Sequence, residues 1–117
     1  MRHPLFDRTT MNTRLKEIQN WVDLANQANW SASAVAAECN VSLRTLQRYF
    51  NYKMGKSPKA WLFEQRQKRA AELLLKGITV KQVANHLGYQ HSTQLSREFK
   101  KYWGHAPTIR KAGLELR

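Results

Sequence analysis

The sequence has a single cysteine, Cys39, among its 117 residues. One thiol cannot form an intramolecular disulfide and cannot supply the paired thiolates of a zinc site. The histidines at positions 86, 91 and 105 have no spacing typical of metal ligands and no thiol or acidic cluster beside them. We therefore expect a protein of the reducing cytoplasm that holds no metal and no cofactor.

Long apolar runs are also missing. No stretch approaches the roughly 20 apolar residues of a membrane-spanning helix, and the opening Met-Arg-His-Pro does not begin a signal peptide. The sequence contains no phosphate-binding loop, no carboxylate pair and no nucleophile beside a base. It therefore predicts a soluble intracellular protein that does not span a membrane and is not an enzyme.

Acidic residues are scarce. The 8 Asp and Glu residues stand against 20 Lys and Arg residues, so the formal net charge is +12. Such an excess favours a polyanionic partner, with nucleic acid as the first expectation and an anionic membrane surface as the second. The basic residues alternate with apolar ones along predicted helices, which indicates a folded domain rather than a disordered basic tail.

Glycine and proline are few, and two of them delimit a long helix. Pro58 suits a first helical turn, Gly77 suits a helix end, and no glycine, proline or β-branched residue lies between them. This pattern predicts a linker helix over 58–76, which rises about 27 Å at about 1.5 Å per residue. We expect a flexible arm over 1–12 and a short tail over 111–117.

A packing helix and a helix-turn-helix are predicted before this linker. Apolar residues recur at helical spacing over 13–28, with Trp21 beside the apolar face. Ser31 is placed to cap a short helix and Ser42 to cap the next, over 43–54. Asn40 tolerates the left-handed backbone of the tight turn between them.

The same arrangement returns after the linker. Thr79 is placed to cap a helix, Gly88 makes the turn, and a longer helix is predicted over 92–103. Five residues recur at one constant offset, and the pair Val35-Ala36 recurs as Val83-Ala84 at an offset one residue shorter, so the second turn has an added residue. The recurring leucines and phenylalanines are expected in the cores; the matched sets are Leu46, Arg48, Phe50, Gly55 and Pro58, and Leu95, Arg97, Phe99, Gly104 and Pro107.

The order and spacing of these motifs resemble the DNA-binding domain of the AraC/XylS family of bacterial transcription regulators, most of all its small single-domain members. The resemblance covers roughly residues 13 to 110. It differs at Asn40, where the family usually has glycine, and at His91, where the family often has a capping serine. It also differs after Pro107, where Ile109-Arg110 comes one residue earlier than the family's aromatic residue and arginine. The matching residues are the run from Val41 to Phe50, Gly55, Ser57-Pro58, Arg66, Ala70, Leu73, Leu74, Val83-Ala84, Gly88-Tyr89, the run from Leu95 to Lys101, Gly104 and Pro107.

This resemblance implies an all-α fold with two helix-turn-helix subdomains, over 13–57 and 77–110, joined by the linker helix. It further implies sequence-specific binding of double-stranded DNA, with the second helix of each subdomain in one of two successive major grooves. Transcription activation and contact with RNA polymerase also come from the resemblance. Two unlike reading helices in one chain predict a monomer on an asymmetric site, in the cytoplasm and associated with the bacterial nucleoid.

Individual roles follow from side-chain chemistry on the outer faces of these helices. Arginine can form a forked pair with guanine and glutamine with adenine, whereas lysine typically binds phosphates without sequence choice. Arg66, on the linker, is expected to pair with an acid such as Glu64 or Glu72, or to anchor a subdomain. The base-reading candidates are Arg44, Gln47, Arg48, Thr93, Ser96 and Arg97, and the phosphate candidates are Lys53, Lys100 and Lys101.

Two other functions are compatible with the same sequence. The chain is alternatively a protein-interaction module that binds RNA polymerase or another regulator through an exposed Tyr102 or Trp103. It is alternatively a non-specific nucleoid-type DNA binder, for which the net charge would be sufficient.

Overall fold

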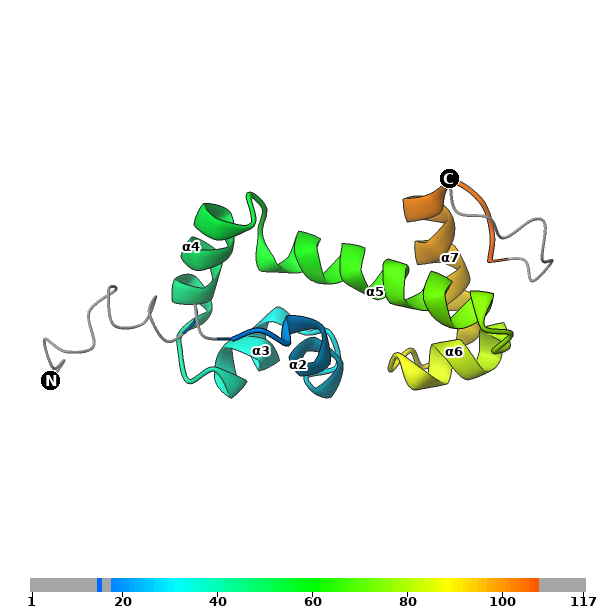
Figure 1. Ribbon diagram of the computed structural model, residues 1–117, viewed down its shortest axis with the longest axis horizontal. Coiled ribbons are helices and arrows are strands. Elements are labelled where there is room, and N and C mark those ends of the chain that lie inside the picture. Colours follow the sequence, from blue (N-terminus) through cyan, green and yellow to red (C-terminus); the bar gives the residue numbers. More distant parts are fainter. Residues whose placement is uncertain (1–14, 16–17, 108–117) are drawn as a thin grey trace, which may run out of the picture. The chain divides into compact units, whose positions relative to one another are not determined.

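The computed structural model describes residue 15 and residues 18–107, and every regular element in this part is an α-helix (Figure 1). The predicted all-α class is confirmed. None of the described helices combines the length and the apolar character that crossing a membrane requires. The helices are α2 (Trp21–Gln27), α3 (Ala32–Glu38), α4 (Leu43–Lys53), α5 (Pro58–Leu75), α6 (Val80–His86) and α7 (Ser92–Trp103).

The described helices belong to two compact units that meet inside α5, between Leu62 and Phe63. Unit 1 contains α2, α3, α4 and the first turns of α5, and unit 2 contains the rest of α5 with α6 and α7. The division therefore falls within the predicted linker helix and not at its ends. The predicted arm over 1–12, the tail over 111–117 and residues 108–110 lie outside the described residues.

Aromatic rings form the core of unit 1. The Phe50 ring on α4 meets Trp21 of α2 edge to face, with centroids 4.9 Å apart, and meets Trp61 of α5 in the same way at 5.4 Å. Leu46 and Phe50 are fully buried, as predicted. Edge-to-face pairs of this kind add to the free energy gained from burying the rings, so α4 is held from two sides.

The prediction of one continuous helix over 13–28 is wrong. Residues 18–20 are not helical, and α2 begins at Trp21. The predicted apolar stripe left Trp21 beside the buried face, whereas the structure buries Trp21 against Tyr49 and Phe50. A tryptophan buries more apolar area than any other side chain on this segment. The helix break directly precedes Trp21, whose side chain is buried in the core.

The described core of unit 2 is mainly aliphatic and includes one buried polar side chain. Leu95 and Phe99 of α7 are fully buried, as predicted, and so are Val83 and Leu87 from the α6 region, which packs against α7. The α5 side chains in this unit are buried at Ala70, Ala71, Leu73, Leu74 and, unusually, Gln67, which has no exposed surface.

Caps fix where the helices of both helix-turn-helix pairs begin. The Ser42 hydroxyl accepts from the Thr45 backbone N–H at 3.0 Å. Thr79 and Gln82 cap α6 reciprocally, each side chain accepting from the other residue's backbone N–H at 3.2 Å. At α7 the Gln94 side chain accepts from the His91 backbone N–H at 3.4 Å. The predicted capping roles of Ser31, Ser42 and Thr79 are confirmed.

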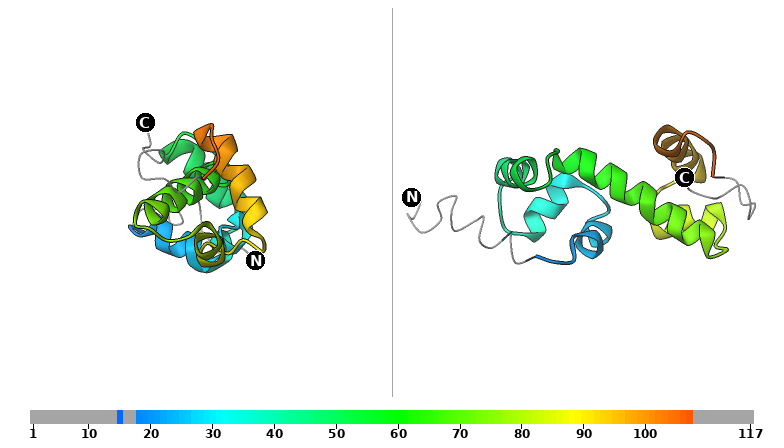
Figure 2. Two further views of the ribbon diagram at one scale, coloured as in Figure 1. Left: turned by 90° about the vertical axis from the view of Figure 1, so that its right-hand side faces the viewer. Right: turned by 45° about the horizontal axis from the view of Figure 1, so that its top comes forward.

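The two turns close with the same pair of hydrogen bonds around a left-handed residue. Asn40, with φ of 61°, donates its backbone N–H to Ala37, and Val41 donates to Ala36. Gly88, with φ of 82°, and Tyr89 repeat this pattern in unit 2. The second turn is one residue longer, as predicted. Figure 2 shows the helices from two further directions.

The left-handed backbone at Asn40 yields a stability prediction. Asn40→Ala should lower the free energy of unfolding by about 1 kcal/mol, because a Cβ disfavours positive φ unless the side chain compensates locally. Asn40→Gly should stay within about 0.5 kcal/mol of the parent, because glycine adopts positive φ freely. Urea denaturation followed by circular dichroism measures both.

The matched control is Asn51→Ala, which replaces an exposed asparagine inside α4 and should not lower the free energy of unfolding. Equal losses from Asn40→Ala and Asn40→Gly would contradict the argument from backbone conformation.

Candidate nucleic-acid interface

The outer face of α4 carries three of the predicted base-reading side chains. Arg44, Gln47 and Arg48 are all exposed, while Leu46 and Phe50 of the same helix point into the core. The 11 residues of α4 include no acidic side chain. Lys53, a phosphate candidate, is exposed in the last turn. The exposed face of α4 therefore offers donors and positive charge, which suits base edges and phosphates.

The outer face of α7 also carries three of the predicted base-reading side chains, but they differ in exposure. Thr93 and Arg97 are exposed and lie one turn apart, whereas Ser96 is half-buried and less available than predicted. Lys100 and Lys101 are exposed in the last turn, and the Lys101 ammonium lies 5.9 Å from the centroid of the Phe63 ring. We call α4 and α7 the reading helices, after the role predicted for them.

Tyr52 was missed by the sequence interpretation. Its side chain is 82% exposed, and it follows Arg44 and Arg48 at four-residue steps along α4. Residues four apart share a helix face, so this spacing was the available signal. Tyr52 extends the outer face of α4 beyond Arg48.

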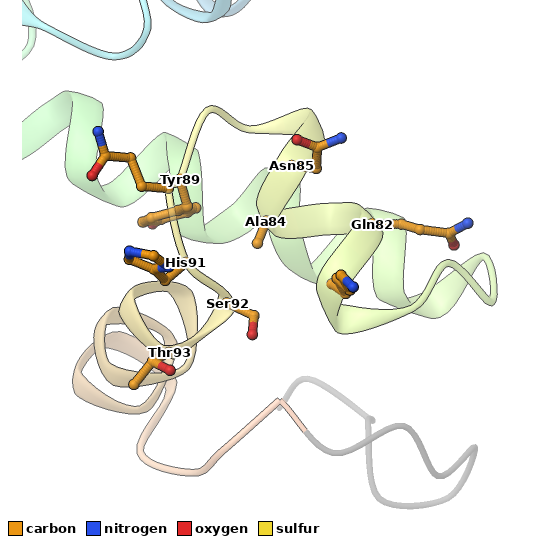
Figure 3. Close-up of a pocket in the computed structure, with 9 residues that line it drawn as sticks. Gln82, Ala84, Asn85, Tyr89, His91, Ser92 and Thr93 are labelled. Carbon is orange, nitrogen blue, oxygen red and sulfur yellow. The ribbon is translucent and has the colours of Figure 1, made fainter.

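Each reading helix borders a groove within its own unit. In unit 2 the groove is lined by side chains from α6, from the turn and from the first turn of α7 (Figure 3). In unit 1 the starts of α3 and α5 line a groove together with Gln47 of α4. Neither lining includes a carboxylate, while Lys81 lines the first groove and Lys59 the second. The cationic, polar surface therefore continues from the reading helices onto their neighbours.

Arg66 anchors the turn of unit 2. Its guanidinium donates from Nη2 to the Leu87 carbonyl at 2.8 Å and lies 3.7 Å above the centroid of the Tyr89 ring. Burial lowers the pKa of this guanidinium from its ordinary value. Of the two roles expected for Arg66, these contacts match the anchoring role.

Three further side chains form a hydrogen-bonded triangle beside Arg66. Gln67 of α5 donates from Nε2 to the Tyr89 hydroxyl at 2.8 Å and to Glu98 Oε1 at 3.2 Å, and the Tyr89 hydroxyl donates to Glu98 Oε1 at 2.6 Å. Burial, followed by the hydrogen bond to Glu98, raises the pKa of Tyr89 above its ordinary value. Glu98 is the one acidic residue of α7, and this polar triangle of Gln67, Tyr89 and Glu98 holds its carboxylate.

The two aromatic residues expected at the interface of an interaction module are only partly exposed. Tyr102 and Trp103 are half-buried against α5, where Tyr102 donates to Glu64 Oε2 at 3.2 Å and Trp103 donates to the Gln67 carbonyl at 3.3 Å. The prediction that either ring is exposed is therefore wrong, because indole N–H and phenol O–H groups find partners when the ring is packed. Among the described residues, no group of three His, Cys, Asp or Glu side chains is placed to hold a metal ion.

A family model described as a helix-turn-helix domain matches residues 35–110, which include both reading helices. The chain belongs to the AraC-type helix-turn-helix family. The family expected from the motif spacing is thereby confirmed.

Curated relatives in this family are named as transcription regulators. The HTH-type transcriptional activator RhaS of Escherichia coli O157:H7 is 31% identical over 98 residues, which cover 81% of this chain and 34% of RhaS. The HTH-type transcriptional regulator RipA of Corynebacterium glutamicum is 34% identical over 91 residues, or 77% of this chain and 28% of RipA. The chain thus spans about a third of the length of these relatives.

Solved structures share the fold. A DNA-binding transcriptional dual regulator from Escherichia coli K-12 superposes with a TM-score of 0.65 at 28% identity, covering 92% of this chain and 94% of that one. An AraC-type transcriptional regulator from Chromobacterium violaceum gives a TM-score of 0.67 at 23% identity, covering 91% and 96%. Both solved structures therefore share the fold of this chain.

The raised pKa of Tyr89 predicts a loss of stability in alkali. The unfolded chain loses this proton near pH 10.0, whereas the folded chain retains it to higher pH. Unfolding therefore releases a proton above pH 10.0, so the associated stability is complete below that pH and declines as the pH rises further. The free energy of unfolding should fall more steeply above pH 10.0 in the parent than in Tyr89→Phe.

Urea denaturation at a series of pH values measures this difference. Tyr52→Phe is the matched control, because it removes the hydroxyl of an exposed tyrosine and should keep the parent's pH dependence. Parallel curves for the parent and Tyr89→Phe would contradict the prediction.

Proposed function

We propose that the chain is a sequence-specific, double-stranded DNA-binding transcription regulator that uses α4 and α7 as its reading helices. The observation that carries this proposal is the pair of exposed arginines, Arg48 and Arg97, at equivalent positions of the two repeats, each on a helix face without an exposed carboxylate. The AraC-type family and the regulator names of its members support the same function.

The two arginines are the central base-reading residues of the proposal. A guanidinium can donate to guanine O6 and N7 together, and the major groove presents both atoms. Arg44, Gln47, Thr93 and Ser96 contribute to base choice beside them. We call the base pairs chosen through each arginine the Arg48 sub-site and the Arg97 sub-site.

The exposed lysines bind the DNA backbone in this proposal. Lys53, Lys100 and Lys101 lie in the last turns of the reading helices. Phosphate contacts fix the protein on the duplex and add affinity that depends on salt.

We further propose how this regulator engages DNA and acts on transcription. With subdomains over 13–57 and 77–110, the 18-residue α5 serves as their linker helix, and the two reading helices enter successive major grooves. RhaS is named an activator, which favours activation here, and we include contact with RNA polymerase in the proposal. Two unlike reading helices suit a monomer on an asymmetric site, and we place the protein on the nucleoid in the bacterial cytoplasm.

Selection from a randomised duplex library at near-physiological salt tests the proposal. We expect enrichment of an asymmetric motif about two DNA turns long, since each reading helix occupies one groove. Uniform recovery of all sequences would indicate a non-specific binder instead. Failure to recover any DNA would contradict DNA binding and favour a protein partner.

Removing either arginine should relax base choice at one sub-site only. Arg48→Ala and Arg97→Ala should each cost about 1–3 kcal/mol on the selected motif, because each removes a forked pair with a guanine. Titration of the motif and of its single-base variants measures the discrimination at each sub-site.

Arg69→Ala is the matched control, because Arg69 lies on α5 and pairs with Glu72 at 2.9 Å. Equal weakening of binding to every sequence would mean that Arg48 or Arg97 contacts phosphate and not a base.

Lys100→Ala should instead change the salt dependence. Loss of one phosphate contact should reduce the slope of log affinity against log salt by about 1, with the sequence preference unchanged. Binding titrations over a range of salt concentrations measure this slope. A changed base preference with an unchanged slope would assign Lys100 to base reading.

A further inference from the structure

The two reading helices are held in their units by different kinds of contact. When the repeats are aligned through their shared residues, Tyr89 corresponds to Val41 and Glu98 corresponds to Tyr49. In unit 1 both side chains are buried, and Tyr49 packs its ring near those of Trp21 and Phe50, with both centroid distances 6.2 Å. In unit 2 the corresponding pair is joined by a hydrogen bond of 2.6 Å.

The polar triangle uses all of its donors inside the unit. The two hydrogens of Gln67 Nε2 go to the Tyr89 hydroxyl and to Glu98 Oε1, and the hydroxyl hydrogen of Tyr89 goes to the same carboxylate oxygen. These three residues come from α5, from the turn and from α7. The triangle therefore links the reading helix to the two segments that support it.

These hydrogen bonds constrain α7 more narrowly than apolar packing would. Apolar contact is non-directional, whereas a buried donor or acceptor that loses its partner costs about 1–3 kcal/mol. Glu98 directly follows Arg97, so a rotation or shift of α7 that breaks the Glu98 contacts also turns Arg97. The polar triangle thus selects one orientation of the face that carries Arg97.

We propose that Tyr89 is a positioning residue for base reading by α7, acting through Glu98 to set the direction of Arg97. This inference rests on the proposed function, since it concerns how the second reading helix chooses its bases. Among the described residues of unit 1, no side-chain hydrogen bond joins Val41 to Tyr49, so we expect the effect at the Arg97 sub-site alone.

Tyr89→Phe tests this role in the full chain. The substitution retains the ring beneath Arg66 and removes only the hydroxyl, so the net charge is unchanged. Discrimination at the Arg97 sub-site should fall about 3- to 10-fold, the equivalent of one lost hydrogen bond. Discrimination at the Arg48 sub-site should stay at the parent value and serves as the internal control.

A double variant separates positioning from stability. If Tyr89 acts through Arg97, then Tyr89→Phe combined with Arg97→Ala should discriminate at this sub-site no worse than Arg97→Ala alone. Tyr49→Phe is the matched control, because the Tyr49 hydroxyl has no hydrogen-bond partner among the described residues. It should leave both sub-sites unchanged.

A second pair of variants keeps the test independent of how well Tyr89→Phe folds. Glu98→Gln and Glu98→Leu remove the same charge, but only glutamine retains an oxygen that accepts from Tyr89. Glu98→Gln should therefore discriminate better at the Arg97 sub-site than Glu98→Leu by several-fold.

Failure of the positioning role of Tyr89 and failure of sequence-specific DNA binding would give different results. Equal losses at both sub-sites, or a lower melting temperature with unchanged discrimination, would make Tyr89 merely structural and overturn the positioning role. Independent, multiplicative effects of Tyr89→Phe and Arg97→Ala would also overturn it. A parent protein without base choice at either sub-site would overturn the proposed function itself.

Discussion

Both cores of this protein depend on side chains from one helix, α5. Its first turns supply Trp61 and the buried Leu62 to unit 1, and its later turns supply Gln67, Ala70 and Leu74 to unit 2. The helix contains no interior glycine or proline, and Gly77, with φ of 91°, follows its end. Small domains have little apolar area with which to offset chain entropy, so each unit requires the turns of α5 that it contains.

The two units use that helix in different ways. In unit 1 the contribution is a ring, since Trp61 meets Phe50 of α4 edge to face. In unit 2 it is a pair of polar side chains, Arg66 over the Tyr89 ring and Gln67 in the polar triangle. Apolar packing tolerates small adjustments of α4, whereas the hydrogen bonds of unit 2 favour one orientation of α7. The repeat thus preserves the fold of the two units while changing how the reading helix is fixed.

Local chemistry made most helix boundaries predictable from the sequence. Ser42 and Thr79 act as caps and Asn40 adopts the left-handed backbone, because these properties depend on neighbouring residues alone. The break before α2 was not predictable in the same way, since it follows from the burial of Trp21 against rings distant in sequence. Local periodicity holds no information about such partners.

In the candidate site, too, the features set by local helical spacing were predictable and those set by residues distant in sequence were not. Exposure of Arg48 and Arg97 followed from helical spacing opposite Leu46 and Leu95, and the base-reading roles remain predictions. The polar triangle could not be predicted, because Gln67 and Glu98 are 31 residues apart and both are types usually exposed. Tyr102 and Trp103 were misjudged for the same reason, since their partners lie on α5.

Methylation interference on a selected duplex tests the central claim, that two unlike reading helices choose bases on one DNA. Methylation of guanine N7 blocks a forked arginine in the major groove, so each reading helix marks its own position. We predict two separate groups of interfering guanines about one DNA turn, or about 10 base pairs, apart. A single group, or weak interference spread evenly along the duplex, would contradict it.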